Sequence, residues 1–187
     1  DQLLYVIARQ RARVHALPGV VGTLMSNLGF EHALGRLGIA LGRAKVGDRY
    51  VLEMMQDKGW QFGGENSGHI ICLDRHSTGD GIIAALQVLA ALRSTNETLA
   101  EACADLQLYP QRLINVRMPA GFDWQADTSI QAGVKSAEAA LDGSGRILLR
   151  PSGTEPLLRV MVEGREAVLV NGQAEAIALA VRKAFEG

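Results

Sequence analysis

The chain has 187 residues, a formal net charge of −1 and 48% hydrophobic residues. Such a composition is typical of a soluble globular protein with one large or two small domains. The sequence has no run of Lys and Arg interleaved with aromatic residues, which argues against a nucleic-acid surface. The longest apolar run, Gly81 to Leu92, is interrupted by Gln87 and is shorter than the roughly 18 residues that a membrane-spanning helix needs. We therefore expect no nucleic-acid or membrane partner and favour small-molecule ligands.

Residues 1–108 are predicted to form an α/β domain, because segments with helical and with extended periodicity alternate along them. Leu3, Leu4 and Ile7 recur at helical spacing, and Val20 and Val21 begin a short apolar run that is typical of a buried strand. The predicted helices are 2–14, 28–37, 48–58, 80–93 and 94–106, and the predicted extended segments are 20–25, 39–46 and 70–73.

Three helix starts are predicted from capping residues. Asp48 is expected to cap the helix that ends at Lys58, and Ser77 or Thr78 is expected to cap the helix that begins at Asp80. Ser94 to Glu97 has the spacing of a capping box, which predicts a further helix that continues through Leu106.

Residues 109–187 are predicted to form a smaller α+β domain with an antiparallel sheet, after a boundary at Tyr109-Pro110-Gln111. The expected order is β-α-β-β-α. The strands are predicted at 113–118, 146–150 and 157–163, the helices at 129–141 and 172–185, and a turn at 142–145.

The cysteines and the first residues indicate a compartment and a context. Cys72 and Cys103 lie in apolar or helical patterns, which favours buried thiols in a reducing cytoplasm, although a disulfide between them stays open. The sequence shows no secretory signal. It begins at Asp1 without Met, so we expect a piece of a longer protein.

The stretch Arg150 to Pro156, R-P-S-G-T-E-P, lies between two predicted strands and favours anion binding. Its prolines stiffen the backbone, and Gly153 permits the dihedral angles of a tight turn. Ser152 and Thr154 add hydroxyl donors beside backbone N–H groups. The guanidinium of Arg150 has the planar geometry that suits phosphate oxygens, and Arg159 follows in the next strand. An ordinary hairpin turn is the alternative reading.

The stretch G-G-E-N-S-G-H at residues 63–69 favours recognition of a polyol. Glu65 can accept hydrogen bonds from two adjacent hydroxyls, and Ser67 can donate or accept. The glycines allow a ligand to approach the backbone closely. His69 has two readings, a ligand contact or a structural hydrogen bond at the start of a strand. A nucleophile–base pair of Ser67 and His69 is disfavoured, because no G-x-S-x-G elbow is present.

Other charged residues have simpler readings as surface groups or caps. Lys45 and Arg49 are interpreted as solvated surface charges, although they could add positive charge to a cleft. Asp74, His76 and Asp80 superficially resemble metal ligands, but a loop followed by a helix cap explains them more simply. No metal site is expected in this chain.

The motifs G-E-N-S-G-H, T-G-D-G and R-P-S-G-T-E-P resemble, in this order, the third and fourth domains of the α-D-phosphohexomutases. V-G-T-L-M-S-N at residues 21–27, A-K-V-G-D-R-Y-V at 44–51 and Asn66 are similar to bacterial members of the family that act on glucosamine phosphates. The resemblance extends over essentially the whole chain.

The resemblance implies a three-layer α/β domain followed by an α+β domain whose antiparallel sheet is TATA-box-binding-protein-like. It also implies an isomerase that interconverts glucosamine 6-phosphate and glucosamine 1-phosphate, on the route to bacterial wall sugar nucleotides. Such enzymes work through a phosphoserine, a bisphosphorylated sugar and Mg²⁺. The residues implied to hold the sugar are Glu65, Asn66, Ser67 and His69, and those implied to clamp the non-reacting phosphate are Arg150, Ser152, Gly153, Thr154 and, as a weaker candidate, Arg159.

The serine loop and the magnesium loop of the family belong to its first two domains and have no counterpart in this sequence. The resemblance therefore implies a C-terminal half whose catalytic residues, Mg²⁺ ligands and partner domains lie upstream, and which is inactive alone. Two alternatives stay open: a fragment with glucose or mannose preference, and a non-catalytic sugar-phosphate binding module. The oligomeric state is not predicted.

Overall fold

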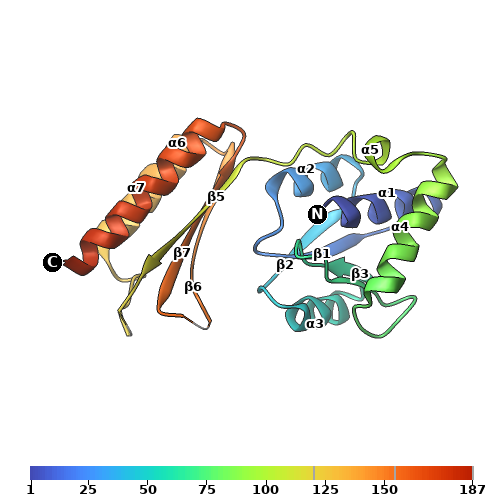
Figure 1. Cartoon of the computed structure of the whole chain (residues 1–187), viewed down its shortest axis with the longest axis horizontal. Helices are drawn as coiled ribbons and strands as arrows, with labels where there is room; N and C mark the ends of the chain where they lie inside the picture. Colours follow the sequence, from blue (N-terminus) through green and yellow to red (C-terminus); the bar gives the residue numbers. More distant parts are fainter. Residues whose placement is uncertain (120, 154, 187) are drawn as a thin grey trace. The chain divides into compact units, whose positions relative to one another are not determined.

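The computed structural model describes residues 1–119, 121–153 and 155–186, and it separates into two compact units, Asp1–Leu108 and Tyr109–Gly187 (Figure 1). Every helix in the described part of the chain is too short or too polar to cross a lipid bilayer.

The first unit is an α/β domain with a four-stranded sheet of order β2-β1-β3-β4. Strand β1 is parallel to both β2 and β3, whereas β4 is antiparallel to β3. The predicted α/β class is confirmed, with an antiparallel strand at one edge. The elements are α1 (Gln2–Val14), β1 (Gly19–Thr23), α2 (Leu28–Arg36), β2 (Ala40–Ala44), α3 (Asp48–Lys58), β3 (Phe62–Gly64), β4 (Ile70–Cys72), α4 (Gly81–Thr95) and α5 (Leu99–Ala102).

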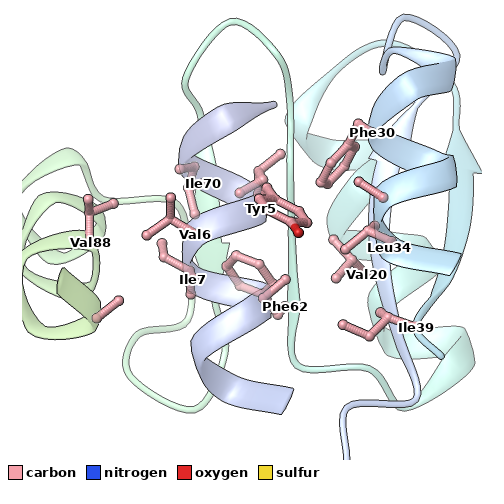
Figure 2. Close-up of a cluster of buried hydrophobic side chains, with 14 of the residues drawn as sticks. Tyr5, Val6, Ile7, Val20, Phe30, Leu34, Ile39, Phe62, Ile70 and Val88 are labelled. Carbon is pink, nitrogen blue, oxygen red and sulfur yellow. The ribbon is translucent and has the colours of Figure 1, made fainter. Parts of the chain in front are cut away.

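Apolar side chains on both faces of this sheet build the core of the first unit. Every residue of β1 is buried, as expected for a parallel strand covered by helices on both sides. Val20 belongs to the cluster on the α1, α2 and α4 side, where Tyr5 of α1 and Phe62 of β3 are also buried (Figure 2). Val21 belongs to the opposite cluster, together with Met55 of α3. The unit therefore has three layers, helix, sheet and helix.

Strand β3 (Phe62–Gly64) overlaps the polar stretch 63–69, where the sequence pattern predicted no strand. Its glycines permit very close backbone contacts, because a Cβ on Gly63 would lie 2.6 Å from the carbonyl oxygen of Val21. A Cβ on Gly64 would lie 2.5 Å from the carbonyl oxygen of His69. Glycine is therefore needed here for strand packing, although it disfavours a strand in sequence-based reasoning.

The predicted helix caps are wrong at all three positions. Asp48 is the first residue of α3, and the cap is Gly47, whose φ of 131° favours glycine. Helix α4 is capped by Asp80, whose Oδ1 accepts hydrogen bonds from the N–H groups of Ile82 and Ile83 at 2.8 Å each, and not by Ser77 or Thr78.

The capping box is displaced by four residues from its predicted position. Ser94 lies inside α4, where its hydroxyl donates to the carbonyl of Ala91 at 2.8 Å. The actual box joins Thr98 and Glu101 at the start of α5, which is only four residues long. The helix predicted to continue through Leu106 is therefore much shorter.

The second unit has the predicted β-α-β-β-α order and an antiparallel sheet of order β5-β7-β6. Helices α6 and α7 pack on one face of this sheet, over a core that includes Val160 and Ile177. Helix α7 begins five residues before its predicted start at Gly172. The elements are β5 (Gln111–Arg117), α6 (Thr128–Leu141), β6 (Gly145–Pro151), β7 (Leu157–Gly164) and α7 (Ala167–Glu186).

Candidate functional site

The first group of predicted site residues lies on the hairpin between β3 and β4. The strands pair through Gly64 and Ile70, and the N–H of Glu65 donates to the carbonyl of His69 at 2.8 Å. Gly68 closes the turn with a hydrogen bond of 3.1 Å to the carbonyl of Glu65 and has a φ of 102°. A left-handed glycine thus makes this tight turn possible.

Glu65 is tied to the start of helix α3. Its Oε1 accepts a hydrogen bond of 2.9 Å from the backbone N–H of Gly47. A carboxylate is favourable there because a helix N-terminus carries partial positive charge. The carboxylate has about four acceptor sites, so one N–H leaves capacity for ligand hydroxyls. The side chain is fixed and can still accept further hydrogen bonds.

The other three predicted site residues of this hairpin, Asn66, Ser67 and His69, are exposed. Asn66 donates from Nδ2 to the carbonyl of Met25 at 3.5 Å. The imidazole Nε2 of His69 lies 3.8 Å from Oδ2 of Asp48, and about half of each side chain is exposed. An open depression of about 410 Å³ is lined by Ser67, Gly68, His69, Ile70, Asp80 and Gly81.

The segment Thr23–Ser26 contributes a buried polar turn that the sequence interpretation did not explain. The side chains of Thr23 and Ser26 are fully buried. The N–H of Thr23 donates to Oγ of Ser26 at 3.0 Å, and the N–H of Met25 donates to Oγ1 of Thr23 at 3.1 Å. These bonds fix the Met25 carbonyl that Asn66 contacts. The only sequence signal was the motif V-G-T-L-M-S-N itself.

Arg43 of β2 holds this turn from the neighbouring strand. Its Nη1 donates to the carbonyl oxygen of Ser26 at 2.6 Å and to that of Thr23 at 3.3 Å. Nη2 of Arg43 is paired with Glu31 of α2 at 2.7 Å. The guanidinium therefore connects β1, β2 and α2 next to the candidate site. Sequence reasoning missed Arg43, because nothing in its local pattern distinguishes it from a surface arginine.

The Glu65 hairpin and the Thr23–Ser26 turn lie at the end of the sheet where the parallel strands finish. Thr23 ends β1, Ala44 ends β2 and Gly64 ends β3, and these three strands are parallel. The carboxyl ends of parallel strands meet at the same edge, where open α/β sheets bind their ligands. The Glu65 hairpin and the Thr23–Ser26 turn thus occupy the edge at which a ligand is expected.

The second group of predicted site residues lies on the hairpin between β6 and β7. Arg150 is directly opposite Arg159 in the antiparallel register, and Asn115 of β5 is opposite Arg159 on the other side. Both arginines are half-buried, and the Nε of each is buried without a hydrogen-bond partner among the described residues. Burial lowers the pKa of the Arg150 guanidinium, and the nearby charge of Arg159 lowers that pKa further. The hairpin therefore carries two adjacent positive charges with unsatisfied donors.

The turn of this hairpin contains Ser152 and Gly153. The N–H of Ser152 donates to the carbonyl of Leu157 at 2.8 Å, and its Oγ accepts from Nη2 of Arg159 at 3.3 Å. Thr154, the remaining predicted phosphate ligand, lies outside the described residues. Glu65 and its neighbours thus belong to one unit, and Arg150 and its neighbours to the other.

The remaining charged candidates have local partners. Arg49 is paired with Glu53 at 2.9 Å, and Nζ of Lys45 lies 5.8 Å from the centre of the Tyr50 ring. Asp80 caps helix α4. The simpler interpretation of Asp74, His76 and Asp80 predicted a helix cap in this loop, although it placed the cap at Ser77 or Thr78. Within the residues that the structure describes, no cluster of three His, Cys, Asp or Glu side chains has the arrangement of a metal site.

The two cysteines are free thiols. Cys72 is buried, whereas Cys103 is only partly buried, and burial raises the pKa of both thiols. The disulfide that the sequence left open is therefore not formed.

Two domain families match this chain. "Phosphoglucomutase/phosphomannomutase, alpha/beta/alpha domain III" matches residues 1–109, and "Phosphoglucomutase/phosphomannomutase, C-terminal domain" matches residues 113–180. The chain belongs to the phosphoglucomutase/phosphomannomutase family. The resemblance to the third and fourth domains of the phosphohexomutases is thereby confirmed.

Curated relatives are named phosphoglucosamine mutase. The chain is 67% identical to the one from Azoarcus sp. (strain BH72) over 100% of its own residues and 42% of that relative. It is 64% identical to the one from Aromatoleum aromaticum over 98% of its own residues and 41% of that relative. The chain thus spans about two fifths of the length of these proteins.

Solved structures share the fold at low sequence identity. N-acetylphosphoglucosamine mutase from Aspergillus fumigatus, in complex with GlcNAc-6P and magnesium, matches with a TM-score of 0.82 at 20% identity, over 97% of this chain and 46% of that one. A phosphoglucomutase/phosphomannomutase family protein from Burkholderia thailandensis matches with a TM-score of 0.72 at 17% identity, over 100% of this chain and 42% of that one. The predicted pair of fold classes is confirmed.

Proposed function

We propose that this chain is the substrate-binding part of a phosphoglucosamine mutase, which interconverts glucosamine 6-phosphate and glucosamine 1-phosphate. The support is its identity of 67% and 64% to two relatives of that name, each of which is more than twice as long. In this proposal the additional length of the protein supplies the phosphoserine, and this chain binds and orients the sugar phosphate in the cytoplasm.

The adjacent arginines of the β6–β7 hairpin are the observation that carries the proposal. Arg150 and Arg159 are opposite each other in register, and each has a buried Nε without a partner among the described residues. Two half-buried guanidiniums that have no carboxylate partner among the described residues are costly unless an anion neutralises them. A phosphate group has the charge and the oxygen geometry to bind both. We therefore assign Arg150, Arg159, Ser152 and Gly153, with Thr154, to the phosphate that does not react.

The Glu65 hairpin is assigned to the sugar hydroxyls. Glu65 is held by the Gly47 N–H at 2.9 Å, so its remaining acceptor sites have a fixed direction. Ser67 and His69 line the adjoining depression of about 410 Å³, which is large enough for a monosaccharide. Asn66 is held near the Met25 carbonyl and is the residue that we assign to the amino group of the sugar.

A fixed phosphate anchor suits a reaction in which the sugar must bind in two orientations. The phosphoserine transfers its phosphoryl group to the free sugar hydroxyl and gives a bisphosphorylated sugar. After this intermediate reorients, its other phosphoryl group returns to the serine. The residues of this chain contribute by holding the unreactive end, because correct positioning accounts for much of the rate enhancement in phosphoryl transfer.

Magnesium has no fitting site in the part of this chain that the structure describes. We therefore assign the Mg²⁺ of the family to residues outside this chain. One of the matched fold neighbours is described as a magnesium complex.

The proposal is tested by an NMR titration that follows the guanidinium Nε–H signals of Arg150 and Arg159. Glucosamine 6-phosphate is expected to shift both signals, whereas free glucosamine, which lacks the phosphate, is expected to leave them unchanged. Glucose 6-phosphate and mannose 6-phosphate are compared in the same titration. Equal affinity for all three sugar phosphates would remove the glucosamine assignment, and the absence of any shift would remove the phosphate assignment.

A further inference from the structure

The first unit has a cavity of about 330 Å³ at the end of the sheet where its parallel strands begin. Its wall includes Gly19, the first residue of β1, and Trp60, which lies just before β3. Since β4 is antiparallel to the other strands, Asp74 and Arg75 beyond its end also lie at this edge. The cavity is therefore at the opposite end of the strands from Glu65 and has no role in the proposed sugar contacts.

The charged groups of this cavity carry an excess of one positive charge. Nη2 of Arg11 lies 2.9 Å from Oδ1 of Asp74, and Nε of Arg75 lies 3.2 Å from Oδ2 of the same carboxylate. Two guanidiniums thus share one carboxylate. His15 is the other titratable residue in the wall and cannot add negative charge. The wall therefore favours a ligand with one negative charge.

Arg11 has unused hydrogen-bonding capacity. Its contact with Asp74 is an ion pair without hydrogen-bond geometry, and Nη2 is buried without a hydrogen-bond partner among the described residues. The guanidinium also lies over the ring of Phe62, 4.8 Å from the ring centre, which fixes its position. A planar anion in the cavity can accept hydrogen bonds from the N–H groups of this fixed guanidinium that do not face Asp74.

The rest of the wall includes an apolar surface formed by Val14, Leu17, Pro18 and Trp60. The Trp60 ring packs directly on Gly19, where an added Cβ would lie 2.1 Å from a ring carbon. Nζ of Lys58 lies 5.0 Å from the centre of the same ring. The indole is therefore held in place before any ligand binds, and a preformed surface of this kind favours a flat apolar group.

We propose that this cavity binds a small aromatic carboxylate, with the carboxylate at Arg11 and Arg75 and the ring against Trp60. The volume of about 330 Å³ lies at the lower end of the range for small-molecule pockets, roughly 300–1,000 Å³. The site is independent of the proposed sugar and phosphate contacts.

The test is an NMR titration of the 187-residue chain with benzoate and with benzamide, its neutral analogue. Benzoate is expected to shift the indole N–H signal of Trp60 in a saturable manner, and benzamide is expected to bind at least about tenfold more weakly, because it lacks the charge. Equal binding of the two compounds, or no saturable shift with millimolar benzoate, would overturn the proposal.

Three variants make the test specific. Arg75→Ala is expected to weaken benzoate binding by about tenfold, because it removes the excess positive charge. Asp74→Asn is expected to strengthen binding, because it removes the carboxylate that competes for both guanidiniums. Arg49→Ala, a matched exposed arginine of the same unit, is expected to change nothing. Unchanged binding in the Arg75 variant, or weaker binding in an Asp74 variant that remains folded, would contradict the assignment.

Discussion

The carboxylate of Glu65 and the backbone N–H of Gly47 form a 2.9 Å hydrogen bond between the β3–β4 hairpin and the start of α3. The bond connects two segments that follow parallel strands at the same edge of the sheet. Glu65 therefore has two roles to separate, a structural one toward Gly47 and a proposed one toward sugar hydroxyls.

Replacement of Glu65 by Gln and by Ala separates these roles. The Gln side chain keeps an acceptor for the Gly47 N–H, so we expect Glu65→Gln to keep the thermal stability of the chain and to weaken glucosamine 6-phosphate binding. Glu65→Ala is expected to reduce both. Calorimetric melting and ligand titration of the two variants provide the readouts. A Gln variant with wild-type sugar affinity would remove the sugar role.

Removal of Arg43 tests the support of the Thr23–Ser26 turn. Arg43→Ala leaves the carbonyl oxygens of Ser26 and Thr23 without their guanidinium donor, so we expect a loss of about 1–3 kcal/mol in unfolding free energy. Urea denaturation measures this loss. Arg49→Ala is the matched control, because its exposed pair with Glu53 should contribute less than about 1 kcal/mol. Equal stability of the two variants would contradict the supporting role of Arg43.

Buried Glu163 is expected to contribute strongly to the stability of the second unit. It is fully buried, is paired with Arg146 of β6, and accepts a 3.0 Å hydrogen bond from Nε2 of Gln111. Glu163→Ala removes the buried acid that is paired with Arg146, with an expected cost of about 3–5 kcal/mol. The control is Glu175→Ala, which breaks an exposed pair with Arg112 and should cost at most about 1 kcal/mol. Denaturant unfolding distinguishes the two, and a cost below 1 kcal/mol for Glu163 would contradict the prediction.

Stability should fall in acid partly through Asp127, the cap of α6. Its Oδ1 accepts hydrogen bonds from the Ser129 hydroxyl and from the N–H groups of Ser129 and Ile130, which lower the pKa of this carboxyl. A folded-state pKa below the unfolded value means that the contribution is complete above about pH 3.9 and is lost as the pH falls through the lower folded value.

Two substitutions of Asp127 test this dependence. Asp127→Ala is expected to lower the melting temperature at pH 7, and its difference from wild type should shrink below about pH 3.9. Asp127→Asn keeps a neutral acceptor and should lack this acid-dependent component. A difference between wild type and the Ala variant that is constant from pH 7 to pH 2 would contradict the assignment.

The sequence predicted elements well where apolar periodicity was long. Helix α1 at Gln2–Val14 and the three strands of the second unit have clear patterns. Strand β3 was missed because it contains two glycines, which disfavour a strand in sequence-based reasoning. Gly63 is required by its close contact with Val21, and Gly64 by its close contact with His69. Neither contact can be predicted from the local sequence. The capping box was misplaced because Ser94 and Glu97 have the same spacing as Thr98 and Glu101.

The residue types of the candidate site could be predicted from the sequence, but the contacts that support them could not. The two polar motifs proposed Glu65 and Arg150 as candidates from residue type alone, and their roles stay predictions. Strand pairing sets Arg150 opposite Arg159, and it also brings Arg43 close enough to donate hydrogen bonds to the Thr23–Ser26 turn. No local sequence pattern contains that information.

The most direct test of the central claim is a calorimetric titration of glucosamine 6-phosphate into the wild-type chain and into Arg150→Ala. The account predicts that the variant loses roughly 1.5–3 kcal/mol of binding free energy, the range for hydrogen bonds to charged groups. Arg112→Ala, which removes an exposed arginine of the same unit, should bind as wild type does. Equal affinity of the wild-type chain and Arg150→Ala, or no measurable binding to the wild-type chain, would contradict the phosphate site.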